Sequence, residues 1–325
     1  MNRDPINPFY FGPVKEPEIF AGRREELNRL NGFLHDAERG VFRHAAILGK
    51  SGIGKTSLLN MFKKRAEEHG GTLVAHLDLY KPLSKTGDPL DLFRGLEVEI
   101  LKGLRKVDPS LISYVEDVGK KFFGTETGAL SQSSKIKLEL GLPNLAGVTI
   151  ERALKKGTYS PLSLLLRTDF DELAQRARKK GLRGIFVVLD EAHVLAELVD
   201  ARTVLQLFKN TFQSQDSYSM IVYGDSKTLT RITHIHEGFG NLFEAVTLRE
   251  LPRPDAIALI RSRLDWAADK GEIVKFEERA IEQIVEHSKG NPRNLVRFCC
   301  EAVEEARRRG TPVTTSLIKP LRATR

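Results

Sequence analysis

Short apolar runs alternate with longer amphipathic stretches along the chain up to about residue 250. The runs fall at 43–48, 72–79, 185–189, 219–223 and 245–248. Short apolar runs of this kind are typical of strands that are buried on both faces, and helical spacing between them is typical of βαβ units. The pattern therefore predicts an α/β fold with a parallel sheet.

After Pro252 the pattern changes to helices alone. These helices are marked by Ile257, Ile260 and Leu264, by Ile281, Ile284 and Val285, and by the segment 295–306. A further helix is expected to begin near Arg23, because Leu27, Leu30 and Leu34 form an apolar stripe behind it. We therefore expect an α/β domain over 1–252 and a smaller helical domain over 253–325.

An insertion of about 107–160 interrupts the α/β pattern. In it, Ile136, Leu138, Leu140 and Leu142 alternate with polar positions, and alternation resumes after a Pro-Asn turn. Strict alternation predicts a β-hairpin. Two roles stay open for this hairpin: contact with a partner, or a flap that stabilises the core.

A glycine-rich loop follows the first apolar run. Residues 49–56 read Gly-Lys-Ser-Gly-Ile-Gly-Lys-Thr, which matches G-x-x-x-x-G-K-[ST] at every position. Such a loop turns its backbone N–H groups toward phosphates, while the lysine (Lys55) reaches the β- and γ-phosphates and the threonine (Thr56) binds Mg²⁺. The expected ligands are ATP and Mg²⁺. The candidate binding residues are Gly49, Lys50, Ser51, Gly52, Ile53, Gly54, Lys55, Thr56 and Ser57.

Two carboxylates end the apolar run 185–189. They are Asp190 and Glu191, at the carboxyl end of an expected parallel strand, where open α/β sheets bind ligands. Asp190 is suited to hold Mg²⁺, and Glu191 to act as general base for a water that attacks the γ-phosphate. The alternative is that both residues only cap the following helix.

Composition indicates a globular chain without a membrane span. The chain has 325 residues, of which 41% are hydrophobic and 29% charged. No apolar run has the length needed to cross a bilayer, and the first residues lack the apolar core of a signal peptide, so we expect a cytoplasmic protein. The only cysteines, Cys299 and Cys300, are adjacent, which argues against a disulfide framework and favours a buried pair on a helix.

The positive charge is concentrated near the C-terminal end of the sequence. The net charge is +8, and the segment 289–325 carries nine basic and three acidic residues. Arg307, Arg308 and Arg309 are suited to bind nucleic-acid phosphates or an acidic partner, although basic residues also complement the dipole at a helix C-terminus. Since no motif for reading bases is found, any DNA binding is expected to be non-sequence-specific.

Residues 20–27 read Phe-Ala-Gly-Arg-Arg-Glu-Glu-Leu. They resemble the F-x-G-R-x-x-E-L motif of AAA+ ATPases, in the branch shared by origin-recognition-type initiators, transposition and secretion ATPases and STAND signalling ATPases. The loop at 49–56 and the pair Asp190-Glu191 stand in the order of this family's two Walker motifs. Residues 290–293, Gly-Asn-Pro-Arg, resemble the lid motif that supplies sensor 2.

The resemblance covers about residues 19–310. It implies a P-loop NTPase fold with a five-stranded parallel sheet in the order 5-1-4-3-2, and a C-terminal helical lid that folds over the nucleotide. By carry-over from the family, residues 19–23, with Phe20, Gly22 and Arg23, flank the adenine. The lid contributes Pro292, and Arg293 approaches the γ-phosphate as sensor 2.

Two positions depart from the family pattern. Sensor 1 would be Asp225 or Ser226, and neither is the usual asparagine or threonine. The segment 238–243, where an arginine finger is expected, contains no arginine, and Arg231 and Arg249 are the nearest. These departures weigh against a ring with hydrolysis activated in trans. They favour slow, switch-like turnover in a monomer or in a partner-dependent assembly. An ATP-dependent homo-oligomer is kept as a separate partner hypothesis.

The function that these features favour is an ATP-hydrolysing AAA+ switch that acts on DNA or on a protein partner. The alternative is a STAND-like signalling or defence ATPase whose effector lies on another chain. A third hypothesis, a nucleotide-binding module that hardly hydrolyses, is disfavoured by Glu191. Initiators carry a winged-helix domain after the lid, and the few residues that follow 310 do not provide one, so shape and charge are expected to govern any DNA contact.

Overall fold

The structure is a computed structural model of the chain that describes residues 7–80, 90–107, 159–213 and 216–318. The chain divides into two compact units, which we describe separately. The loop–lid unit comprises Met1–Leu30, Gly49–Lys64 and Leu248–Arg325, and the sheet unit comprises Asn31–Leu48 and Arg65–Thr247. The hairpin expected within 107–160 lies outside the described residues. The domain boundary expected at 252 stays a prediction.

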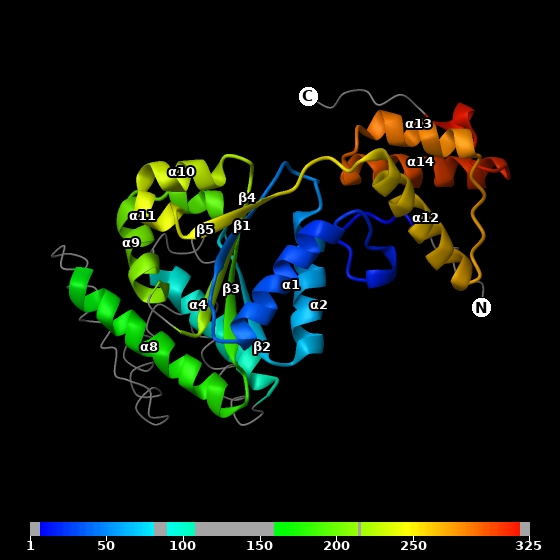
Figure 1. Cartoon of the computed structure of the whole chain (residues 1–325). Helices are drawn as coiled ribbons and strands as arrows, with labels where there is room; N and C mark the ends of the chain where they lie inside the picture. The colour runs from blue at the N-terminus through cyan, green and yellow to red at the C-terminus, as the bar shows by residue number, and fades with distance from the viewer. Residues whose placement is uncertain (1–6, 81–89, 108–158, 214–215, 319–325) are drawn as a thin grey trace, which may run out of the picture. The chain divides into compact units, whose positions relative to one another are not determined.

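The sheet unit is built on five parallel strands (Figure 1). They are β1 (His44–Leu48), β2 (Thr72–Asp78), β3 (Gly184–Asp190), β4 (Tyr218–Gly224) and β5 (Phe243–Thr247). Their order across the sheet is β2-β3-β4-β1-β5, which is 5-1-4-3-2 from the other edge and confirms the prediction. In β3 and β4 nearly every side chain is buried, which explains why these strands are apolar without alternation.

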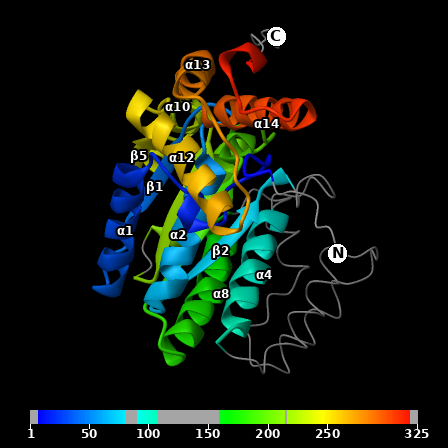
Figure 2. The ribbon, with the colours of Figure 1, turned by 90° about the vertical axis from the view of Figure 1, so that its right-hand side faces the viewer.

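Within the described residues, six helical segments lie wholly in this unit. They are α4 (Leu90–Arg105), α8 (Tyr159–Lys179), η3 (Ala192–Ala196), α9 (Ala201–Phe212), α10 (Thr228–Ile235) and α11 (Glu237–Gly240). Helix α4 runs along the edge strand β2 (Figure 2). Buried aromatic rings join the helices: Phe93 of α4 stacks on Phe208 of α9 at 4.5 Å between centroids, and Phe170 of α8 meets Phe212 edge-on at 4.8 Å. Such pairs contribute about 0.5–1.5 kcal/mol beyond their buried area.

A histidine takes part in the backbone pairing of the sheet. The Nδ1 atom of His44, at the start of β1, accepts a hydrogen bond from the backbone N–H of Met220 in β4 at 2.9 Å. The ladder proper begins one residue later, with Ala45 opposite Ile221. Burial lowers the pKa of His44 to about 4, so the imidazole is neutral and keeps the lone pair that this bond requires.

The loop–lid unit has a helical core of its own. It contains η1 (Pro17–Ile19), α12 (Arg253–Asp269), α13 (Glu278–Ser288), α14 (Pro292–Arg309) and η4 (Thr315–Leu317), and α1 (Arg24–Glu38) and α2 (Lys55–His69) contribute residues to both units. Its core includes Phe9, Ile260, Ile284 and Phe298. Cys299 and Cys300 are both buried and free on α14, which confirms the expected pair.

A second apolar cluster in this unit packs against the only tryptophan of the sequence. Trp266 of α12 packs against a cluster of Val14, Ile19 and Met61, in which Met61 belongs to α2. Its indole ring also faces the Lys270 ammonium at 4.7 Å. The fluorescence of Trp266 therefore depends on how α12 packs against the N-terminal segment and α2.

In the part of the chain that the structure describes, no helix combines the length and the apolar character that a bilayer crossing requires.

Candidate functional site

The glycine-rich loop connects β1 to α2, as the sequence predicts. Two of its glycines have backbone angles that favour glycine, with φ of +76° at Gly52 and +100° at Gly54. At the third, Gly49, a Cβ atom would lie 2.8 Å from Ile53 and 3.0 Å from the carbonyl oxygen of Leu248. The geometry of the loop therefore requires the two glycines that the motif fixes, Gly49 and Gly54, and also Gly52 at one of its free positions.

The six backbone carbonyls of residues 49–54 all accept hydrogen bonds. Their donors, in order, are Lys55 Nζ (2.7 Å), Ile53 N (3.3 Å), Asn291 Nδ2 (3.4 Å), Arg293 N (3.2 Å), Arg23 Nη2 (3.0 Å) and Leu58 N (3.0 Å). Helix α2 starts at Lys55, and the first N–H groups of a helix have no intrahelical carbonyl to bond. With its carbonyls bonded, the loop is suited to direct N–H groups toward an anion.

The side chains of the loop make further contacts within the loop–lid unit. The Lys55 ammonium also lies 3.3 Å from the carbonyl oxygen of Lys50, and Lys50 itself pairs with Glu250 at 2.7 Å. Thr56 is exposed at the first turn of α2. The Ser57 hydroxyl accepts a hydrogen bond from the backbone of Val14 at 3.0 Å, so this residue already serves the packing of the N-terminal segment.

The lid motif lies against the loop. Asn291 caps α14 by accepting from the N–H groups of Arg293 and Asn294, and Pro292 occupies the first turn, where a missing N–H costs nothing. The Arg293 guanidinium donates from Nη1 to the Ser51 hydroxyl at 3.1 Å. A Cβ atom on Gly52 would lie 2.8 Å from the Arg293 Cβ, so only glycine permits this approach. The assignment of Arg293 as sensor 2 remains a prediction.

The segment 20–23 is also built into this unit. Phe20 joins the apolar cluster around Trp266. Gly22 has φ +76°, and a Cβ atom on it would lie 2.8 Å from Leu251. Arg23 is only 5% exposed, and its side chain is directed to backbone carbonyls. This use of Arg23 was not foreseen from the sequence.

The acidic pair belongs to the sheet unit. Asp190 is the last residue of β3 and accepts the backbone N–H of Glu191 at 2.9 Å, while His76 Nε2 lies 3.6 Å from its other oxygen. Glu191 has a left-handed backbone, with φ 56° and ψ 41°, which is rare outside glycine and common at functional turns. The Glu191 carboxylate is half exposed and lies 3.3 Å from Nδ1 of His193.

A tyrosine completes this group of polar residues. The hydroxyl of Tyr80, two residues beyond β2, lies 3.0 Å from Nε2 of His193. Strands β2 and β3 pair in parallel, with Asp78 opposite Asp190, so their carboxyl ends meet at one edge of the sheet. His193, Tyr80 and His76 were missed from the sequence. The signal that would have found His193 is its position two residues after a candidate general base.

The candidates for sensor 1 follow β4. Asp225 accepts hydrogen bonds from the backbone of Lys227 at 2.8 Å and from the Thr228 hydroxyl at 3.0 Å, and Arg231 lies 3.2 Å away. Burial raises the pKa of Asp225, but these hydrogen bonds and the charges of Arg231 and His193 outweigh it and hold the pKa below its ordinary value. Asp225 thus stabilises the start of α10. The exposed Ser226 and Asp225 both stay predictions for the sensor.

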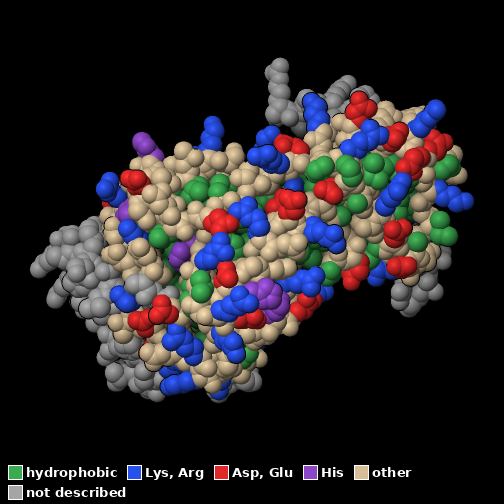
Figure 3. All heavy atoms as spheres, viewed as in Figure 1, with side chains coloured by type: hydrophobic (Ala, Val, Ile, Leu, Met, Phe, Trp, Pro, Cys, Tyr) green, Lys and Arg blue, Asp and Glu red, His purple; other side chains and the backbone are tan. Residues whose placement is uncertain are grey.

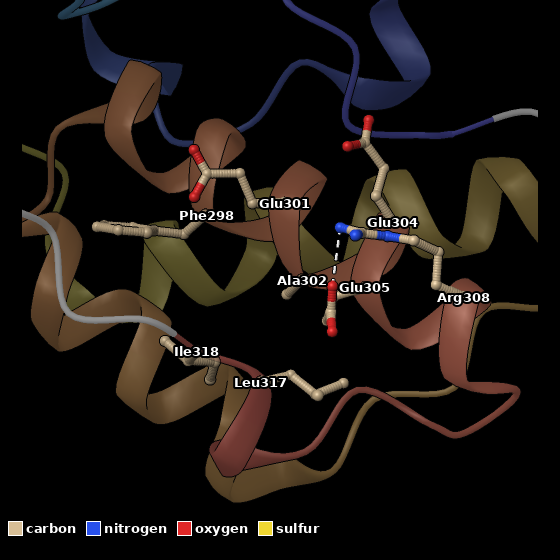
Figure 4. Close-up of a pocket in the computed structure, with 8 residues that line it drawn as sticks. All are labelled: Phe298, Glu301, Ala302, Glu304, Glu305, Arg308, Leu317 and Ile318. Carbon is tan, nitrogen blue, oxygen red and sulfur yellow. Dashed lines mark ion pairs between the residues drawn. The ribbon is translucent and has the colours of Figure 1, made fainter.

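A pocket of about 160 Å³ lies elsewhere in the loop–lid unit (Figure 4). Apolar side chains form one part of it and acidic ones another, with an ion pair between Arg308 and Glu305 at 2.8 Å. Its lining consists of Phe298, Glu301, Ala302, Glu304, Glu305, Arg308, Leu317 and Ile318. None of these is a predicted nucleotide-binding residue, so this pocket is not the expected phosphate site.

A parallel sheet in this order, with a glycine-rich loop after β1 and an acidic pair after β3, is the fold of a P-loop NTPase. The chain belongs to the AAA ATPase domain family, whose match spans residues 19–223.

Relatives with longer chains are similar over nearly all of this sequence. An uncharacterized HTH-type transcriptional regulator of Methanocaldococcus jannaschii is 24% identical over 318 residues, which are 96% of this chain and 71% of the relative. A Walker-type ATPase of Pyrococcus abyssi has a TM-score of 0.56 at 19% identity, covering 92% of this chain and 72% of that one.

Two archaeal proteins of one organism share the fold as well. The ORC2 protein of Aeropyrum pernix, in ADPNP–ADP complexes, has a TM-score of 0.60 at 15% identity. The match covers 97% of this chain and 71% of the ORC2 chain. The ORC1 protein of the same organism, in complex with DNA, has a TM-score of 0.52 at 17% identity, covering 93% of this chain and 65% of its own. At these identities the likeness supports the fold.

Proposed function

We propose that this AAA ATPase domain protein is a Mg²⁺-dependent ATP switch with slow turnover. The observation that carries the proposal is the loop 49–54, whose glycines are required and whose carbonyls all accept hydrogen bonds. In this proposal Lys55 binds the β- and γ-phosphates, and Thr56 and Asp190 supply oxygen ligands to Mg²⁺. Glu191 accepts the proton of the attacking water.

The donor set fits Mg²⁺ better than a metal that needs a protein cage. Asp190 and Thr56 offer a carboxylate and a hydroxyl, which are hard oxygen ligands. Among the described residues, no group of three or more His, Cys, Asp and Glu side chains comes together as a metal site. An ion that keeps several waters and takes further oxygens from the phosphates suits these ligand types.

The lid is proposed to report the state of the nucleotide. Arg293 already contacts Ser51 of the loop through its side chain and Gly52 through its N–H. A γ-phosphate bound in the loop would offer the Arg293 guanidinium a charged acceptor in place of the neutral hydroxyl, and charge-assisted hydrogen bonds are about twice as strong. ATP and ADP should therefore hold the lid differently.

Phosphate release by the purified full chain tests this proposal. We expect turnover below about 1 s⁻¹, the low end of typical enzymes, and its loss when EDTA removes the metal. Segment 238–243 offers no arginine finger, which is the reason for expecting a slow rate. Turnover that persists unchanged in EDTA would contradict the magnesium roles of Thr56 and Asp190.

We infer that the partner of the switch is DNA, bound without sequence preference. Two similar proteins support this: one is described as an HTH-type transcriptional regulator, and another was solved in complex with DNA. The segment 289–325 carries nine basic and three acidic residues. On the face shown in Figure 3, however, basic and acidic side chains are interspersed, so no surface of one sign dominates there.

Fluorescence anisotropy with labelled duplex DNA at low salt decides between DNA and the alternative, a STAND-like signalling ATPase. Binding that weakens as salt rises, equally for unrelated duplexes, is the expected result. If the wild-type chain binds no duplex even at low ionic strength, the signalling hypothesis replaces the DNA hypothesis, and the ATPase proposal is unaffected.

A further inference from the structure

The carbonyl of Ile53 occupies an unusual position in the phosphate loop. It lies between Gly52 and Gly54, both with positive φ, and the residue is 1% exposed. A buried backbone carbonyl needs a hydrogen-bond donor, because leaving one unpaired costs about 1–3 kcal/mol. The donor here comes from neither the loop nor its helix. It is the guanidinium of Arg23, at 3.0 Å.

The same guanidinium nitrogen binds a second segment. Nη2 of Arg23 also donates to the carbonyl of Arg249 at 2.6 Å, while Nη1 pairs with Glu26 at 3.2 Å. Arg249 belongs to the connector, which we define as residues 248–252 between β5 and α12. Arg23 is therefore a single buried cation that touches both the phosphate loop and the start of the lid.

The connector also makes close backbone contacts with Gly49 of the loop and with Gly290 before the lid motif. At its start, the carbonyl of Leu248 would lie 3.0 Å from a Cβ atom on Gly49. Further along, the N–H of Leu251 donates to the carbonyl of Gly290, directly before the lid motif, at 2.8 Å. A Cβ atom on Gly290 would lie 2.5 Å from the Leu251 carbonyl. A shift of the connector would therefore displace or strain both the loop and the lid motif.

Carboxylates around Arg23 stabilise its positive charge at this buried position. Burial lowers the pKa of Arg23, whereas the carboxylates of Glu26, Asp255 and Glu250 act in the opposite direction. Its Nε atom is buried and has no hydrogen-bond partner among the described residues. Burying a guanidinium with an unpaired N–H costs free energy, and the hydrogen bonds to the two carbonyls offset that cost.

We propose that Arg23 is a positioning residue for nucleotide turnover, which couples the phosphate loop at Ile53 to the lid connector at Arg249. The inference rests on the proposed ATPase function and assigns Arg23 a role apart from the adenine contact that family resemblance implies. When Lys55 binds the phosphates, it no longer donates to the carbonyls of Gly49 and Lys50. The loop is then held by the three donors from outside it, which are Asn291, Arg293 and Arg23. Among the described residues, Arg23 is the one of these three donors that also bonds the connector, which Lys50 of the loop contacts as well through Glu250.

The test compares Arg23→Lys and Arg23→Gln with Arg24→Gln, a control that removes the same charge from the exposed next residue. A lysine keeps the charge but lacks the planar fork, and a glutamine lacks the charge. We measure the affinities for Mg·ATP and Mg·ADP by calorimetry, kcat and KM, thermal stability, and the fluorescence change of Trp266 on nucleotide binding.

We expect Arg23→Gln to weaken Mg·ATP binding by roughly 10- to 100-fold, the range for losing a buried charged hydrogen bond. The ATP-dependent response of Trp266 should be lost in Arg23→Gln and reduced in Arg23→Lys, while Arg24→Gln matches the wild type. A purely structural role would lower thermal stability and leave affinity and the Trp266 response of the folded fraction intact. That result would overturn the proposal.

Hydrogen exchange on the wild-type chain gives a second test that needs no variant. On adding Mg·ATP, amide exchange should slow together in residues 49–58, which comprise the loop and the first turn of α2, and in the connector. If the loop is protected and the connector is not, the coupling is refuted. A wild-type chain that binds no Mg·ATP at all contradicts the proposed ATPase function, whereas normal binding with unchanged Arg23 variants contradicts the coupling alone.

Discussion

The Glu191 carboxylate lies 3.3 Å from Nδ1 of His193, and the other ring nitrogen of His193 lies 3.0 Å from the Tyr80 hydroxyl. The candidate general base is thus held in a chain of polar contacts that begins beyond β2. Replacing it should affect the chemical step and leave nucleotide binding in place.

Glu191→Gln should keep Mg·ATP affinity and slow hydrolysis by at least ~10²-fold, because an amide cannot accept the proton of the attacking water. Glutamine also preserves the side-chain size at this left-handed backbone position. Single-turnover phosphate release measures the effect, with the exposed Glu197→Gln as control. The Glu191 side chain makes no capping hydrogen bond to the following helical turn, so an unchanged rate would simply mean that Glu191 is not the general base. Asp190→Asn should instead weaken the dependence on Mg²⁺.

Lys55→Ala should abolish measurable Mg·ATP binding, since the phosphates lose the cation that the loop carries at its helix start. Lys50→Ala is the matched control: it removes the same charge from the same loop, but from a side chain paired with Glu250. Calorimetric titration of both variants gives the answer. Equal affinities in the two would contradict the assignment of the phosphate site.

Arg293→Ala should lower hydrolysis and reduce the ratio of ATP to ADP affinity, because the γ-phosphate loses a charged donor. Ser51→Ala removes only the hydroxyl that Arg293 contacts at 3.1 Å, and it should change this ratio little. Affinities for both nucleotides, measured on each variant, distinguish the two cases. If Arg293→Ala keeps both the rate and the ratio, the sensor 2 assignment fails.

The lowered pKa of His44 predicts a specific loss of stability in mild acid. Its pKa is about 4 in the folded chain and about 6.5 when unfolded, so between these values the unfolded state binds the extra proton. Stability should therefore fall as pH drops from 7 to 5, by about 2 kcal/mol from this residue. His44→Asn keeps an acceptor for the N–H of Met220, and it should make the urea-unfolding midpoint depend less on pH. The exposed His234→Gln should not.

Basic residues at the end of α14 give a test of the DNA hypothesis. The structure pairs Arg307 with Glu272 at 3.6 Å, and Arg308 and Arg309 with Glu305 at 2.8 and 2.7 Å. Replacing the three arginines with alanine should flatten the plot of log affinity against log salt by up to about 3 units. Glu305→Gln frees two arginines and should strengthen binding. A slope that neither change affects would place the DNA contact elsewhere.

The sheet was predicted well because buried parallel strands leave uninterrupted apolar runs in the sequence. For β3 the predicted 185–189 became Gly184–Asp190, and even the edge strand β5 moved by only two residues at its start. The strand order came from the resemblance to AAA+ ATPases rather than from periodicity, which carries no information about neighbours. The loop at 49–56 was recognised because its motif fixes two glycines: Gly49, where a side chain would clash, and Gly54, which has a positive φ.

The contacts that hold the motifs in place could not be predicted in this way. That Arg23 flanks the adenine stays a prediction from the family resemblance, whereas its contacts with the carbonyls of Ile53 and Arg249 left no signal in the sequence. His193 meets both Glu191 and Tyr80, which are far apart in the sequence. Such partners depend on how the chain folds back on itself, and no local pattern of residues encodes that.

The neighbours of β1 bear on how the chain folds as it leaves the ribosome. This strand ends at Leu48, yet its partners are β4 and β5, and the last pairing residue is Thr247. At a synthesis rate of about 5–20 residues per second, an apolar strand made early waits roughly 10–40 s for both of its partners. Closing such distant contacts is intrinsically slow. Newly made chains should therefore depend on chaperones during this interval, and truncation before β5 should leave an aggregating product.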